Sequence, residues 1–249
     1  MLKLGRIPSR PDPRTLQFAR YVSLQDVPAS PPARDWAHPQ DAPAFGMFAN
    51  DSLGDCTCAA IGHYLQAQSA ITGLPLTIAG ADVIRLYRDV AGYDPKRPET
   101  DQGAEMLDVL TEMRAVGLCG HRFGAFVAVD PANREHMEAA LNLTGWVYCG
   151  VDLPLATFDQ TVWDVGVGQR YEPNSRGPHS MAKLSYDRSF DIYVTWGGLK
   201  VTTRKWSERY TSEAWAALDE QWIDDTTMLS PSGFNLRQLM RDLVEIDRT

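Results

Sequence analysis

The two residues best suited to chemistry are Cys56 and His179. Cys56 opens a run of small and apolar residues without proline, which is typical of a buried helix. A cysteine in the first helical turn feels the positive end of the helix dipole, which favours the thiolate. His179 follows Gly177-Pro178 and precedes a predicted strand, so we expect its ring at the end of a sheet. A thiol and an imidazole are the pair that a cysteine nucleophile needs.

The other cysteines and histidines form no comparable pattern. The 249 residues include four cysteines and no C-x-x-C pair, too few for a disulfide scaffold, and we expect them to be thiols. Cys58 and His63 lie near enough to Cys56 in sequence to suggest metal ligands. On a helix, however, Cys56 and His63 share a face while Cys58 points elsewhere. We therefore expect no metal and no other cofactor.

The first half of the chain has helical periodicity. After the run that begins at Cys56, residues 81–91 and 104–116 carry apolar side chains at helical spacing. A further helix is expected to open at Asp130-Pro131, where a capping acid precedes a proline, and to end near Leu141. These segments predict a helical lobe that carries Cys56.

After Gly145 the sequence becomes strand-like. Strands are predicted at residues 146–151, 180–186, 192–196 and 199–206, with turns at residues 187–189 and 197–198. Helices followed by an antiparallel sheet predict an α+β fold with two lobes. His179 belongs to the second lobe, so it would meet Cys56 where the two lobes face each other.

The domain boundaries follow from these patterns. Prolines interrupt residues 1–30, a leader that we expect to be an extended strap laid over the body. Residues 31–130 form the predicted helical lobe and residues 131–210 the sheet lobe. Residues 211–249 are predicted as two C-terminal amphipathic helices, the first with Trp215, Leu218 and Trp222 on its apolar face and the second from Leu236 to Ile246.

Composition excludes several functions. The formal net charge is −8 and the chain has no basic tract, which argues against nucleic acid as a partner. No uninterrupted apolar run approaches 18 residues, so no membrane span or membrane partner is expected. The N-terminus lacks the apolar core and cleavage site of a secretory signal. We therefore expect a cytoplasmic protein or a component of a viral particle.

Several motifs resemble those of the papain-like cysteine peptidases. Asn50 to Cys56 (Asn-Asp-Ser-Leu-Gly-Asp-Cys) has the length of the family's Gln-Gly-x-Cys-Gly-Ser-Cys. Residues 32–36 resemble the Pro-x-x-x-Asp-Trp opening of the mature domain. Residues 177–181 resemble Gly-x-His-Ala-Val, and residues 194–197 resemble Lys-Asn-Ser-Trp-Gly. Weaker likenesses, some of them to bacterial members, extend the match to roughly residues 10 to 210.

The resemblance implies a papain-like fold, with a helical lobe followed by an antiparallel sheet or barrel lobe, and it implies four site residues. Cys56 would be the nucleophile and His179 the base. Asn50 stands where the family keeps its oxyanion glutamine, and Thr195 stands near the asparagine that orients the imidazole. Both replacements are departures from the family. A threonine hydroxyl can accept a hydrogen bond from a ring N–H, but it holds the ring less firmly than an asparagine carbonyl.

Asp187 and Asp191 are the alternative partners for the imidazole, since some thiol enzymes use a carboxylate. Both flank the predicted turn at the far end of the strand from His179. We interpret them as solvated acids of that turn.

Three functions agree with these residues. The first is a papain-like thiol peptidase or amidase acting on a peptide or protein substrate. The second is a catalytically degenerate papain-like protein with a structural or binding role, such as a bacteriophage virion component with a protein partner in its assembly. The third is an acyltransferase or deamidase that uses the same thiol.

Overall fold

The structure is a computed structural model, and it describes residues 2–13, 15–21, 29–38, 44–224, 227 and 229–233. Its helices are α1 (Phe18–Tyr21), α2 (Cys56–Ile71), α3 (Gly80–Ala91), α4 (Met106–Ala115), α5 (Arg134–Thr144) and α6 (Arg204–Tyr210). Its strands are β1 (Arg6–Ile7), β2 (Arg34–Asp35), β3 (Ala104–Glu105), β4 (Phe123–Ala128), β5 (Val147–Leu153), β6 (Gly177–Tyr186), β7 (Phe190–Thr195), β8 (Gly198–Thr203) and β9 (Thr211–Asp219).

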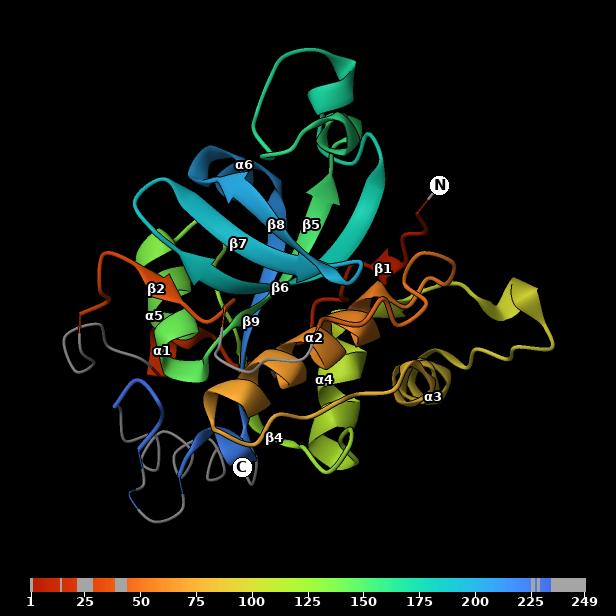
Figure 1. The fold of residues 1–249 in the computed structure, drawn as a ribbon. Coiled ribbons are helices and arrows are strands. Elements are labelled where there is room, and N and C mark those ends of the chain that lie inside the picture. The colour runs from red at the N-terminus through yellow and green to blue at the C-terminus, as the bar shows by residue number, and fades with distance from the viewer. Residues whose placement is uncertain are drawn as a thin grey trace.

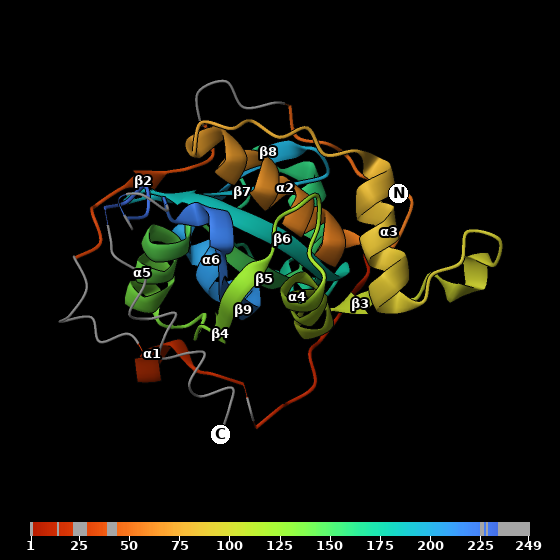
Figure 2. The ribbon, with the colours of Figure 1, turned by 90° about the horizontal axis from the view of Figure 1, so that it is seen from below.

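A large antiparallel sheet forms the centre of the molecule. Its strands are ordered β4-β9-β5-β6-β7-β8, and β2 pairs with β6. Helices α2, α3 and α4 gather on one side of the strongly twisted sheet, as Figure 1 shows. The view in Figure 2 places β6 between α2 on one side and α5 on the other. The predicted α+β fold is confirmed.

Both faces of the sheet are buried, so the molecule has two apolar cores. Val147, Cys149 and Val151 of β5 pack in the core that contains α5 and α6. Trp146 and Tyr148, which point the other way, pack in the core that contains α2, α3 and α4. This double burial explains why residues 147–151 of β5 read as an unbroken apolar run in the sequence.

The predicted first C-terminal helix is wrong, because Thr211–Asp219 is strand β9. Ala, Trp and Leu in this segment satisfy a helical pattern, but β9 lies between β4 and β5 and is buried along most of its length. Pairing on both edges overrides the local preference. The predicted second tail helix, from Leu236, falls outside the described residues.

The boundaries of the lobes also differ from the prediction. Strand β4 joins the sheet although it lies in the segment assigned to the helical lobe, and α5 lies in the segment assigned to the sheet lobe. Helix α5 begins later than predicted: Asn133, not Asp130, is its N-cap, and the Asn133 side chain accepts a hydrogen bond from the His136 N–H. No helix in the described part of the chain is long and apolar enough to cross a membrane.

Residues 2–10 form an extended segment that we call the strap. Its strand β1 pairs in parallel with β3, and the Ala104 N–H donates to the Gly5 carbonyl at 2.9 Å. The Lys3 N–H donates to the Asp51 carbonyl at 3.1 Å, in the loop before α2. The strap therefore connects the start of α2 with the start of α4.

Candidate active site

Cys56 is the first residue of α2 and lies at the boundary between the helices and the sheet. Helix α2 packs against β6 and β7, and the Tyr148 hydroxyl on β5 donates to the Thr57 carbonyl at 2.9 Å. The backbone N–H groups of Ser180 and Gly5 face the Cys56 thiol and favour its ionised form. Because Ser180 follows His179 directly, the chain brings the predicted thiol and imidazole to the same place.

His179 lies near the start of β6, and its ring is fixed on one side. Its Nε2 atom lies 2.7 Å from the Thr195 hydroxyl oxygen. Its Nδ1 atom is buried and has no hydrogen-bond partner among the described residues. In the tautomer protonated on Nε2, the ring donates to Thr195 and leaves Nδ1 as an acceptor. Thr195 thus occupies the position expected of an orienting residue, and its part in catalysis remains a prediction.

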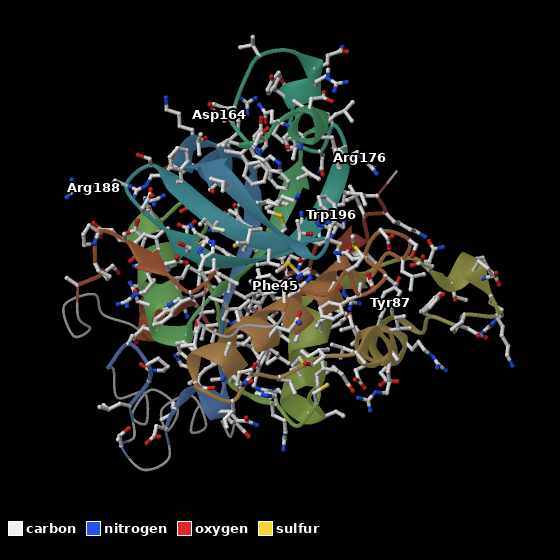
Figure 3. All side chains as sticks on the ribbon, viewed as in Figure 1. Phe45, Tyr87, Asp164, Arg176, Arg188 and Trp196 are labelled. Carbon is white, nitrogen blue, oxygen red and sulfur yellow. The ribbon has the colours of Figure 1, made fainter. Side chains whose placement is uncertain are left out.

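Trp196 covers the imidazole. The two rings are stacked, with centroids 4.4 Å apart and planes inclined by 17°. Trp196 and Gly197 both have positive φ, 49° and 67°, and form the two-residue turn between β7 and β8. Glycine adopts this conformation readily, whereas tryptophan pays a strain cost. Figure 3 places Trp196 at the end of the sheet that also carries Arg176.

Asn50 lies in the loop before α2. Phe48 and Ala49 have positive φ, and the Asn50 N–H donates to the Met47 carbonyl at 3.0 Å, so the loop turns tightly. His63 on α2 holds this loop through a ring nitrogen 2.8 Å from the Gly46 carbonyl. The Asn50 side chain is buried, and neither of its amide atoms has a hydrogen-bond partner in the part of the chain that the structure describes.

The strap covers the thiol. Gly5 lies so close to the loop before Cys56 that a Cβ atom on it would stand 1.9 Å from the Gly54 carbonyl oxygen. Only glycine leaves room for this approach. With the Gly5 N–H directed at the sulfur, Cys56 has no exposed surface. The leader was expected to lie over the body, and its position on Cys56 could not be read from the sequence.

Burial holds both groups neutral in this arrangement. It raises the pKa of the Cys56 thiol to about 12, although the N–H groups of Gly5 and Ser180 oppose the shift. It lowers the pKa of His179 to about 3, and the positive charges of Arg6 and Arg176 add to that effect. The strap-covered site therefore holds a thiol and a neutral imidazole instead of an ion pair.

Asp55, directly before Cys56, was not singled out from the sequence. It is completely buried, and burial raises its pKa to about 8. Neither carboxyl oxygen has a hydrogen-bond partner among the described residues. Asp55 is therefore protonated at neutral pH, so no negative charge stands beside the thiol there.

The two alternative carboxylates lie away from the imidazole. Asp187 is a turn acid, as predicted, and accepts hydrogen bonds from the N–H groups of Ser189 and Phe190. The interpretation of Asp191 as a solvated acid is wrong. It is completely buried and forms an ion pair of 2.9 Å with Lys183, because its strand position faces the core and an acid there needs a cation.

The fold is similar to solved structures of cysteine proteases. No protein-family model and no curated protein matches the sequence. Xylellain, a cysteine protease from Xylella fastidiosa, is 14% identical, with a TM-score of 0.63 over 87% of this chain and 96% of xylellain. Procathepsin B S9 from Trypanosoma congolense is 11% identical, with a TM-score of 0.61 over 88% of this chain and 86% of its own.

A third solved structure agrees. Procathepsin L 3 from the larval midgut of Tenebrio molitor is 12% identical, with a TM-score of 0.57 over 87% of this chain and 75% of its own. Identity is low throughout, so the likeness lies in the order and packing of the elements. The chain has the two-lobed papain-like fold of these cysteine proteases.

Proposed function

We propose that this protein is a thiol peptidase or amidase that uses Cys56 and His179. The observation that carries the proposal is the state of the imidazole. Its Nε2 atom lies 2.7 Å from the Thr195 hydroxyl oxygen, and its Nδ1 atom is buried and has no hydrogen-bond partner among the described residues. The N–H of Ser180, the next residue in the chain, faces the Cys56 thiol. A ring held in this way is ready to take the thiol proton.

The residues suggest a sequence of steps once the strap has moved. His179 accepts the Cys56 proton as the sulfur attacks the carbonyl carbon of the substrate. The backbone N–H of Cys56 and the Asn50 amide donate to the oxyanion of the tetrahedral intermediate. The carbon–nitrogen bond breaks as His179 returns the proton to the leaving amine. Water, deprotonated by His179, then hydrolyses the thioester and frees Cys56.

A second candidate, a catalytically degenerate papain-like protein that binds a partner, has one observation in its favour. The Nδ1 atom of His179 makes no hydrogen bond with the Cys56 thiol. Acyl transfer by the same thiol is a third candidate and differs only in the acceptor that attacks the thioester.

Proteolysis by the full chain with the strap displaced tests the proposal. A Gly5→Ala variant, which cannot seat the strap, is incubated with a denatured protein, and new amino termini are sought by mass spectrometry. We expect cleavage that Cys56→Ser and His179→Ala each abolish. An added amine that is incorporated instead of water would favour acyl transfer. No reaction, with four similarly reactive thiols, would favour the degenerate protein.

A further inference from the structure

Two side chains of α2 hold the loop that precedes this helix. The Nε2 atom of His63 lies 2.8 Å from the Gly46 carbonyl oxygen. Gln66, about one turn further along α2, accepts a hydrogen bond from the Gly46 N–H at 3.2 Å and donates to the Ala44 carbonyl at 3.1 Å. Three contacts thus tie the backbone of residues 44–46 to α2.

The ring of His63 acts as a hydrogen-bond donor to the loop. A carbonyl oxygen accepts and does not donate, so Nε2 carries the proton. Nδ1 is buried and has no hydrogen-bond partner among the described residues. Burial lowers the pKa of His63 to about 4, although the Gly46 carbonyl opposes the shift. His63 is therefore a neutral donor at neutral pH.

Two phenylalanines of the same loop pack against the His63 ring. The Phe45 ring, labelled in Figure 3, lies edge-on to it with ring centroids 6.0 Å apart. The Phe48 ring is inclined by 32°, with centroids 5.2 Å apart. Gly62 makes room for this packing, because a Cβ atom there would stand 2.7 Å from the Phe48 ring. His63 is 1% exposed, so water does not compete for its hydrogen bond.

A tight turn connects the held residues with Asn50. Phe48 and Ala49 both have positive φ, 57° and 66°. The Asn50 N–H donates to the Met47 carbonyl at 3.0 Å. Only three residues separate Asn50 from Gly46, and the turn leaves them little freedom. A shift of the loop at Gly46 therefore moves Asn50 as well.

The position of the Asn50 backbone matters because its side chain is short. Asparagine is one methylene shorter than the glutamine at the matching position of the papain-like motif. An oxyanion donor must stand about 2.7–3.1 Å from the developing charge. Neither amide atom of Asn50 has a hydrogen-bond partner among the described residues. The loop, and not a neighbouring side chain, therefore sets where the Asn50 amide lies.

Release of the strap removes a hold on the other side of Asn50. The Lys3 N–H donates to the Asp51 carbonyl at 3.1 Å, directly after Asn50. This bond is lost when the strap leaves Cys56. The contacts from His63 and Gln66 belong to α2 and stay. In the open site the position of Asn50 then depends on α2.

We propose that His63 is a positioning residue that, with Gln66, holds the loop where the short Asn50 amide reaches the oxyanion. Neither residue of α2 touches the substrate, and both act through Asn50. The assignment rests on the proposed peptidase function. It adds to that function the residues that compensate for asparagine at the position of the glutamine.

A double-mutant cycle tests the assignment in the Gly5→Ala background, where the strap is displaced. The substrate is a quenched fluorescent peptide that spans a bond cleaved in the denatured protein. His63→Leu should lower kcat and kcat/KM equally, by about tenfold, since the oxyanion exists only in the transition state. Asn50→Ala should lower both about 100-fold, and adding His63→Leu to it should cause no further loss. A further tenfold loss in the combined variant would overturn the assignment.

Rescue gives a second readout, which a merely structural role would not move. Glutamine places an amide N–H near the position of Nε2, so His63→Gln should keep most of the activity. Asn50→Gln lengthens the oxyanion donor, so it should raise kcat in His63→Leu and not in the presence of His63. His136→Leu, the same change at a half-buried histidine of α5, should leave kcat unchanged. Absence of rescue by either glutamine, or an equal loss in His136→Leu, would count against the assignment.

Hydrogen exchange separates failure of the positioning role from failure of the peptidase function. Exchange of the Asn50 N–H, which is bonded to the Met47 carbonyl, is compared in Gly5→Ala with and without His63→Leu. Faster exchange in His63→Leu without hydrolysis by any variant would support the hold on the loop and reject the peptidase. Equal exchange would overturn the hold on the loop, whether or not the peptide is hydrolysed.

Circular dichroism establishes that the variants are folded. If His63→Leu does not fold, Gln66→Leu replaces it, because that change removes two other hydrogen bonds of the same loop. The same cycle and the same exchange measurement then decide the question.

Discussion

Replacing Gly5 by alanine should uncover Cys56. The added Cβ atom would stand 1.9 Å from the Gly54 carbonyl oxygen and 2.4 Å from the Gly54 Cα atom. Both are backbone atoms, and a contact this short cannot be relieved by turning a side chain. The strap therefore cannot keep its observed position on Cys56 in the Gly5→Ala variant.

The expected change in thiol reactivity follows from the pKa. With the strap in place the Cys56 pKa is about 12, so at pH 7 about one thiol in 10⁵ is ionised. An accessible thiol has a pKa of about 8.5, and about one in 30 is ionised. The thiolate population rises about 3,000-fold, while a thiolate of lower pKa is about 25- to 60-fold less nucleophilic. The net gain is about 50- to 120-fold before any help from His179.

The assay is alkylation by iodoacetamide at pH 7, followed for each cysteine by mass spectrometry. Cys58, a residue of α2 that is buried in the core, is the internal control, since it should label only if the protein unfolds. Gly80→Ala is the matched variant, because the nearest atom to its added Cβ would be 3.9 Å away. A folded Gly5→Ala protein whose Cys56 labels at the wild-type rate would refute the account of the strap.

Three further predictions concern neighbouring groups. Burial raises the pKa of Asp55 to about 8, so the folded protein keeps a proton on Asp55 that the unfolded chain releases above about pH 4. The free energy of unfolding therefore falls as the pH rises, by up to about 4 kcal/mol at pH 7. Urea titrations at pH 5 and pH 8 should show that Asp55→Asn lacks this decrease in the free energy of unfolding. The same decrease in Asp55→Asn and the wild type would contradict the raised pKa of Asp55. In the Gly5→Ala background, where the strap is displaced, Thr195→Ala leaves the His179 Nε2 atom without its hydroxyl partner and should lower kcat/KM about tenfold. Thr195→Ser should restore it. Equal kcat/KM with threonine, alanine and serine at this position would remove Thr195 from the site. Burial opposes the ionisation of Asp101, but hydrogen bonds from Lys3 and other donors lower its pKa overall. Its contribution to the free energy of unfolding is therefore present above about pH 4 and is lost as the pH falls toward the lowered pKa. Asp101→Asn should lose less stability than the wild type between pH 5 and pH 2, and equal losses in the two proteins would count against the Lys3 contact.

The sequence was sufficient for the fold and for the elements that carry the candidate site, because those depend on local pattern and motif order. The run from Cys56 is a helix, and the Gly177-Pro178-His179 motif opens a strand of the sheet. Segment 211–219 was mistaken for a helix because its alanines and large apolar residues fit either state. Only its pairing with β4 and β5 decides for a strand.

The contacts of the strap could not be predicted from the sequence. Its contacts join Gly5 to Gly54, and Arg6 to Asp152 and Glu213, across 49, 146 and 207 residues. The residues around a single arginine in a proline-rich leader do not indicate which distant residues it contacts. A glycine beside it was the one available hint, since glycine permits close approach of two backbones.

The measurement that tests the central claim most directly is the pH dependence of Cys56 alkylation between pH 5 and pH 9, in Gly5→Ala and in Gly5→Ala with His179→Ala. A thiolate paired with an imidazolium stays ionised at pH 5 to 6, where an ordinary thiol is protonated. We expect Cys56 to label much faster than Cys119 in that range, and the advantage to vanish without His179. If Cys56 labels no faster than Cys119 at pH 5 to 6 in folded Gly5→Ala, the two residues are not a catalytic pair.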